Sequence, residues 1–329
     1  MDFAWLVAIV LLALIFDFLN GVNDSGVLVA TMISTGAISP RKAMMLASVA
    51  DFLGPFIFGV AVATTIGTGI VNPEAISVAV VFAALVSAIA WNILAWRTGM
   101  PTSSTHALVG GIVGAAVAAR GPEILIMAGL LKIVIVLLVA PILGGLLGYV
   151  SLKIALLGLR SATPKVNRVF KSGQVGTSFL LALSHGAMDA QKTMGVITMA
   201  FVAAGLLSTF EVQFWVVVLA AIGIALGVFV GGWHTIRTLG AKIYRVRPVH
   251  GFTSQASSVL IVATAALLGG PVSVAQVATS AIVGAGAGER VSKVRWGVAG
   301  SMITAWLLTL PATALVAILI YKVSVPVLR

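Results

Sequence analysis

Long apolar runs separated by short polar segments fill almost the whole chain. They cover residues 3–32, 43–65, 75–96, 107–119 and 124–150 in the first half, and 175–207, 214–233, 252–268, 277–287 and 299–321 in the second half. A membrane-spanning helix needs ~20 mostly apolar residues. The pattern therefore predicts an all-α polytopic membrane protein with about ten membrane crossings, five in each half of the chain.

Four of these runs do not have the length of a simple spanning helix. The runs 107–119 and 277–287 are too short, and each follows a polar segment that begins with a proline. The runs around Asp24 and Asp189 are too long and are interrupted by polar residues. Broken helices are tolerated in membranes where they are buried in protein or line a cavity. We therefore expect broken or re-entrant half-helices at all four places.

Three short markers of the first half recur in the same order in the second half. They are Gly21-x-x-Asp24 with Gly186-x-x-Asp189, Pro101-x-Ser103 with Pro271-x-Ser273, and Pro141 with Pro311. Five crossings per copy is an odd number, so the second copy must enter the membrane upside down. Secondary transporters form their sites between such inverted repeats, from discontinuous helices. We predict two membrane repeats, 1–152 and 172–329, joined by a basic cytoplasmic linker over 153–171.

Composition and charge narrow the class of protein further. The chain is 60% hydrophobic and 9% charged and contains no cysteine, which leaves no room for a sizeable soluble domain and excludes disulfides and cysteine-ligated metals. The net charge of +11 does not indicate nucleic-acid binding, because most basic residues fall in loops that are cytoplasmic if both termini are outside. We expect a multi-pass plasma-membrane protein with its N- and C-termini outside.

Four aspartates lie inside apolar runs, where a charge costs ~3 kcal/mol or more. Asp24 and Asp189 occupy matched positions of the two repeats and are the strongest candidates for function, whereas for Asp17 and Asp51 a structural ion pair is an equal alternative. Carboxylate, amide and hydroxyl oxygens suit a hard cation such as sodium. The predicted cation-binding and coupling residues are Asn23, Asp24, Ser25 and Asp189, with Asn23, Asp24 and Asp189 as the sodium ligands.

Hydroxyl groups gather where the short half-helices begin. The segment 101–106 places four hydroxyl or imidazole side chains in a row, more than helix capping requires, and helix N-termini bind oxyanions. Lys192 shares a helix face with Asp189, and both neutralisation of that aspartate and anion binding stay open for it. The candidate substrate-binding residues are Ser103, Ser104, Thr105, Gln191, Lys192, Ser273 and Gln276.

The four histidines are weaker candidates for function than the aspartates and the hydroxyl groups. His185 and Asp189 have the i, i+4 spacing of a metal pair, but no third ligand is apparent, so we do not expect a metal there. His106 is either a structural residue or one that touches substrate or relays protons. His234 and His250 flank a basic loop and are expected to be solvated.

Several segments resemble the signatures of the PiT family of inorganic phosphate transporters. They are GVNDSGVLVATMISTGAISPRKAMMLAS, GMPTSSTHALVGGIVGA, SHGAMDAQKTMGV and GGPVSVAQVATSAIVGAG. The resemblance implies ion-coupled symport of inorganic phosphate, driven by sodium in some members and by protons with metal–phosphate complexes in others. It carries the family's Asn-Asp pair to Asn23 and Asp24. Its second copy departs from the pattern, with Met188 in place of asparagine, Val274 and Ala275 in place of hydroxyls, and Gln276 in place of histidine.

We therefore expect a secondary phosphate importer, not an enzyme, with no cofactor and with sodium favoured over the proton as the coupling ion. Transport of sulfate or another oxyanion is the alternative within the family, and a homodimer is a further expectation. An intramembrane aspartyl protease is a remote alternative, because its motif needs Gly before one Asp, where Asn23 and Met188 stand. A passive anion channel would line its pore with more Arg or Lys. No phosphate loop of an ATPase is present in the sequence.

Overall fold

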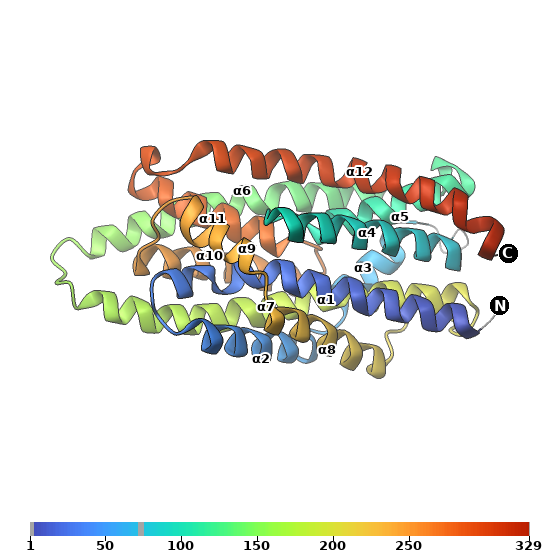
Figure 1. Ribbon diagram of the computed structural model, residues 1–329, viewed down its shortest axis with the longest axis horizontal. Coiled ribbons are helices and arrows are strands. Elements are labelled where there is room, and N and C mark those ends of the chain that lie inside the picture. Colours follow the sequence, from blue (N-terminus) through green and yellow to red (C-terminus); the bar gives the residue numbers. More distant parts are fainter. Residues whose placement is uncertain (1–2, 72–75, 329) are drawn as a thin grey trace.

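The computed structural model describes residues 3–71 and 76–328, and helices make up nearly all of it (Figure 1). The first half contains α1 (Phe3–Ser34), α2 (Pro40–Phe58), α3 (Ala61–Gly69), α4 (Val78–Thr98), α5 (Ser104–Arg120) and α6 (Met127–Gly158). The second half contains α7 (Val166–Ala203), α8 (Phe214–Val230), α9 (Trp233–Arg237), α10 (Pro248–Leu267), α11 (Val274–Glu289) and α12 (Trp296–Leu328). The same order, a long helix, a bent pair, a single helix, a half-length helix and a long helix, thus occurs twice.

The two halves of the chain are interleaved rather than side by side. The half-length helix α5 packs on α12 and its counterpart α11 packs on α6, while α1 packs on α8 and α7 on α2. The chain ends lie at one end of the bundle and the connection between α6 and α7 at the other (Figure 1). The core is therefore shared between the halves, and groups from both meet at its centre.

Four helical segments have the length and composition of a membrane span: Ala4–Ser34, Val78–Thr98, Met127–Gly158 and Trp296–Ser324. Two bent pairs satisfy the same conditions together, Pro40–Phe58 with Ala61–Gly69 at 73° and Phe214–Val230 with Trp233–Gly240 at 56°. Large apolar side chains cover the outer faces of α6 and α12, among them Ile142 and Leu319. An all-α membrane architecture is confirmed, whereas the number of ten crossings, the repeat boundaries and the linker over 153–171 stay predictions.

The prediction of half-helices is right for two places and wrong for the other two. Non-helical segments containing Pro101 and Pro271 precede α5 and α11, as expected. In contrast, α1 and α7 run without a break through Asp24 and Asp189. Side chains of the two helices contact each other around these aspartates, since Asn20 donates to Asp189 and His185 approaches Asp24, so the backbone has no need to open. The additional breaks occur instead between α2 and α3 and between α8 and α9.

Candidate functional site

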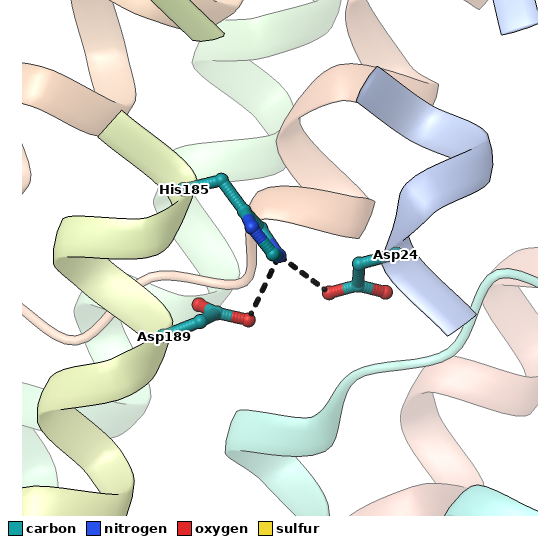
Figure 2. Close-up of side chains that lie close together, drawn as sticks. All are labelled: Asp24, His185 and Asp189. Atoms are coloured by element: carbon teal, nitrogen blue, oxygen red, sulfur yellow. Dashed lines mark ion pairs between the residues drawn. The ribbon is translucent and has the colours of Figure 1, made fainter. Parts of the chain in front are cut away.

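Two helices from different halves bring three titratable side chains together in the core. Asp24 comes from α1, and His185 and Asp189 lie one turn apart on α7, all three pointing toward one another (Figure 2). Atom Nε2 of His185 is 3.5 Å from Oδ2 of Asp24 and 3.3 Å from Oδ2 of Asp189. All three side chains are buried. The imidazole ring thus stands between the two carboxylates that occupy matched sequence positions.

Helix α2 adds a third carboxylate, that of Asp51. Its Oδ1 is 2.8 Å from Nδ1 of His185, and this side chain is also fully buried. The helices come this close because Gly186 has no side chain: a Cβ there would lie 2.0 Å from the carbonyl oxygen of Asp51. A neutral imidazole has one N–H to donate and a protonated one has two. Protonation of His185 therefore changes how many of its three acidic neighbours it can satisfy.

Lys192 connects this acidic cluster to the beginning of α5. Its Nζ is 2.9 Å from Oδ2 of Asp189, and it donates hydrogen bonds to Oγ of Ser104 at 2.8 Å and to Oγ1 of Thr105 at 3.2 Å. Asn20 donates to the same Oδ2 of Asp189 at 2.7 Å. Lys192 is completely enclosed, with 1% of its surface exposed. Both roles left open for Lys192 are thus compatible with its position, since it neutralises Asp189 and also faces the hydroxyls.

The two half-helices begin close to each other. Ser103 caps α5 by accepting the backbone N–H of His106 at 3.1 Å, and Ser273 caps α11 by accepting that of Gln276 at 3.4 Å. The side chains of His106 and Gln276 approach to 3.5 Å. The first N–H groups of the two helices, with the Lys192 ammonium group beside the start of α5, form a polar environment suited to an oxyanion.

Three other candidate residues make contacts elsewhere. Gln191 accepts the backbone N–H groups of Val62 and Ala63 at the start of α3, at 2.7 and 3.2 Å. Ser25 accepts the N–H of Gly232, just before α9, at 2.6 Å. Asn23 donates to the carbonyl oxygen of Asn92 at 3.0 Å. Gln191 and Ser25 thus accept backbone N–H groups that the two helix breaks leave without a partner. The sequence does not predict these contacts, because the breaks lie far from Gln191 and Ser25 along the chain.

Comparison with known proteins places this arrangement in a family. The model of the phosphate transporter family matches residues 20–165 and 158–317. The chain belongs to the phosphate transporter family. The resemblance inferred from the sequence signatures is therefore confirmed.

Similar proteins cover nearly the full length of this phosphate transporter family member. The chain is 42% identical, over 96% of its own length and 76% of the relative's, to a probable low-affinity inorganic phosphate transporter of Mycobacterium tuberculosis strain H37Rv. It is 40% identical to one of Bacillus subtilis, over 96% of both chains. A solved structure named the sodium-dependent phosphate transporter has a TM-score of 0.88 and 28% identity, and the match covers 97% of this chain and 98% of that one. The membrane fold of this phosphate transporter family member is thus established.

One expectation about this family member's histidines is wrong. His185 and Asp189 do have a third possible metal ligand, since one ligand atom from each of Asp24, His185 and Asp189 lies within 4.8 Å of the others. The sequence spacing does not reveal Asp24 as this third ligand, because Asp24 lies on α1, more than a hundred residues away in sequence. Imidazole and carboxylate groups in such a cluster can hold a proton or coordinate a cation.

The expectation for His250 is also wrong, whereas His234 is exposed as expected. His250 is buried in the first turn of α10, with Nε2 2.8 Å from Oε2 of Glu289 and Nδ1 accepting the backbone N–H of Arg247. Burial lowers the pKa of His250 to about 4. A neutral ring with its proton on Nε2 fits both contacts. This histidine tethers the far end of α11 instead of meeting solvent.

Proposed function

We propose that this phosphate transporter family member is a secondary symporter that imports inorganic phosphate together with a cation. The charge of the core carries the proposal. Four buried carboxyl groups, those of Asp17, Asp24, Asp51 and Asp189, share the core with the Lys192 ammonium group and the His185 imidazole, so they outnumber the cationic groups even if His185 is protonated. A phosphate anion would add to this negative excess, and repulsion is strong away from water. Cations that bind with phosphate remove the repulsion, so each ligand raises the affinity for the other.

For the anion we propose a site at the start of α5. Lys192 and the hydroxyls of Ser104 and Thr105 already form one connected group, which supports this assignment. Phosphate oxygens accept hydrogen bonds from hydroxyl, ammonium and helix N-terminal N–H groups. Ser103, Ser273 and Gln276 contribute by shaping the two helix starts. The proposal for Gln191 is a supporting role, at the break before α3.

For the cation we propose the space around Asp24 and Asp189. Sodium is the first candidate, because oxygen ligands prevail there and the similar solved structure is named sodium-dependent. In that case Asn23 and Ser25 support Asp24 from the same helix. The proton is the second candidate, since Nε2 of His185 lies within 3.5 Å of both carboxylates. Sulfate or another oxyanion in place of phosphate remains the alternative substrate.

Uptake of labelled phosphate into proteoliposomes tests the proposed function. Sodium and proton gradients are imposed one at a time. We expect labelled phosphate to accumulate against its own gradient only when one of them is present. Excess sulfate should compete weakly. Asp24→Asn and Asp189→Asn should each abolish driven uptake while the protein stays folded and inserted. Equilibration without accumulation under every gradient would instead make the protein a passive channel.

We further propose a plasma-membrane location with both termini outside, and a homodimer. The chain has no cysteine, so a single introduced cysteine can be labelled without background. Position 209, in the exposed loop between α7 and α8, should react with an impermeant reagent added outside, and exposed position 162, between α6 and α7, only after permeabilisation. Labelling of position 209 from the cytoplasm would contradict the inverted arrangement. Cross-linking in native membranes tests the homodimer.

A further inference from the structure

One buried carboxylate of the core has no partner. Asp17, on α1, is completely buried, and neither of its side-chain oxygens makes a hydrogen bond within the described part of the chain. The neighbouring hydroxyl group of Thr193, on α7, favours the ionised form of Asp17. Thr193 is also fully buried, and its Oγ1 has no hydrogen-bond partner within the described residues. An ionised carboxylate in such a place costs several kcal/mol unless it is paired. Asp17 therefore needs a positive charge or a proton.

The cationic side chains of the core are already committed to other groups. Lys192 uses its three donors on Asp189, Ser104 and Thr105. His185 is surrounded by the carboxylates of Asp24, Asp51 and Asp189. Asp17 contacts neither of them, although Lys192, Asp189 and Asp51 are near enough to act on it electrostatically. The two neighbouring carboxylates oppose its ionisation and the single ammonium favours it.

The surroundings of Asp17 fit a proton better than a metal cation. On the side of α8, Gly223 lies against Asp17: a Cβ there would lie 3.2 Å from Oδ2 of Asp17 and 3.7 Å from a methyl carbon of Leu14. Helix α8 carries no charged residue. Besides the Asp17 carboxylate, Thr193 supplies one side-chain oxygen as a possible ligand. A hard cation such as sodium prefers several oxygen ligands. A protonated carboxyl group needs only a single acceptor, and the buried Thr193 hydroxyl has no other partner within the described residues, so it is free to serve as one.

The position of Asp17 along α1 gives such a proton a role. Asp17, Asn20 and Asp24 follow one another at spacings of three and four residues, so they line one face of α1. Asn20 already reaches across to Asp189. Asp17 comes first in this row, and α1 begins at the end of the bundle where the two chain ends lie (Figure 1). Asp17 therefore lies about two helical turns before Asp24, on the same face of α1 as the Asp24–His185–Asp189 cluster.

We propose that Asp17 is a second, proton-binding coupling site, which is loaded and emptied once in each transport cycle. The inference rests on the proposed symport and holds whichever cation occupies the space around Asp24 and Asp189. From the outward-open state the Asp17 carboxylate takes a proton from external water, forming one O–H bond. From the inward-open state it returns that proton to internal water. Phosphate neither gives nor takes a proton in this step, so charge and atoms balance.

The test measures protons and phosphate together in proteoliposomes loaded with a pH-sensitive dye. In wild type we expect internal acidification in step with phosphate uptake, with sodium equal on both sides. Asp17→Asn keeps the shape of the side chain but cannot release a proton. The number of protons moved per phosphate should fall by about one, while exchange of internal for external phosphate continues. An unchanged ratio in Asp17→Asn would overturn the proposal, and so would a wild type that moves phosphate without protons.

A second variant covers the case in which Asp17→Asn does not fold. Thr193→Val is nearly isosteric and removes the Thr193 hydroxyl, which favours the ionised form of Asp17. The ionised form then loses support, so the pH midpoint of uptake should move upward, and an unchanged midpoint contradicts the proposal. Infrared difference spectra offer an independent readout: a protonated-carboxyl band in wild type should vanish in Asp17→Asn, and its persistence would assign the proton elsewhere. If wild type fails to accumulate phosphate at all, the proposed symport itself fails, and not only the role of Asp17.

Discussion

The half-helices α5 and α11 begin in the same way but have different surroundings. Each follows a proline-containing segment, and each is capped by a serine that accepts the N–H three residues later. After the cap, α5 continues with Ser104 and Thr105, whose hydroxyls meet Lys192, whereas α11 continues with buried Val274 and Ala275. The geometry of a helix start is thus kept in both halves, while the hydrogen-bonding chemistry is concentrated in one.

The far ends of the two half-helices show the opposite contrast. α11 ends at Glu289, which pairs with Arg247, His250 and Lys293. α5 ends at Arg120 followed by Gly121, whose φ of +90° lets the chain turn directly into the next segment. α11 is therefore fixed by ion pairs at its loop end, and α5 carries donors at its core end. Under the proposed function, the half of the chain with α5 contacts the anion and the half with α11 gives support.

The largest expected effect on phosphate uptake is that of replacing Lys192, whose contacts with Ser104 and Thr105 make the start of α5 different from that of α11. Lys192→Met removes the ammonium group and leaves the buried Asp189 carboxylate without its closest cationic partner, and breaking a buried ion pair costs about 3–5 kcal/mol. Phosphate uptake at subsaturating concentration should fall by roughly a hundredfold or more. Initial rates in proteoliposomes measure the effect, with the amount of inserted protein determined in parallel.

A double variant separates transport from folding in this first case. Lys192→Met combined with Asp189→Asn no longer buries an unpaired charge, so stability should recover while uptake stays lost. If the double variant transports like wild type, Lys192 only neutralises Asp189, and the difference between α5 and α11 has no bearing on the anion.

A smaller effect is expected for the hydroxyls themselves. Ser104→Ala and Thr105→Ala each remove one acceptor from Lys192 and one hydroxyl from the proposed anion site. Hydrogen bonds to charged groups contribute about 1.5–3 kcal/mol. The phosphate concentration for half-maximal uptake should therefore rise by roughly tenfold or more in each.

The corresponding positions of α11 provide the matched control for these hydroxyl variants. Val274→Ala and Ala275→Ser change residues at the same places of the second half-helix, where no hydroxyl stands now. Both should leave half-saturation within about twofold of wild type, a change of a few tenths of a kcal/mol. Equal shifts from the α5 and α11 variants would mean that the anion lies symmetrically between the two helix starts.

Much of this comparison could be predicted from the sequence, and the remainder depends on packing between distant helices. Apolar runs and prolines identify the spans and the starts of α5 and α11, because length and backbone chemistry are local properties. The pairing of Lys192 with Ser104 depends on how α7 lies against α5, which no spacing encodes. The same holds for the contact between His185 and Asp24. The predicted breaks in α1 and α7 are wrong, because polar residues in these helices do not require an open backbone where the facing helix contacts them.

The smallest expected effect concerns the anchored end of α11. Glu289→Gln weakens partly exposed ion pairs worth roughly 1 kcal/mol, so the melting temperature should fall slightly while half-saturation by phosphate stays unchanged. The pH dependence provides a sharper measurement. Burial holds the pKa of His250 near 4, below its ordinary value of 6.5, so between these two values the unfolded state binds more protons than the folded state.

Folding stability should therefore decrease as the pH falls from about 6.5 toward 4, and the contribution of His250 is fully present above that window. Replacing His250 by Gln, which cannot charge, should flatten this part of the pH profile of the melting temperature in detergent. A profile as steep in His250→Gln as in wild type would assign the acid sensitivity to other groups. A change in phosphate affinity in either variant would show that the far end of α11 takes part in binding and is not only a support.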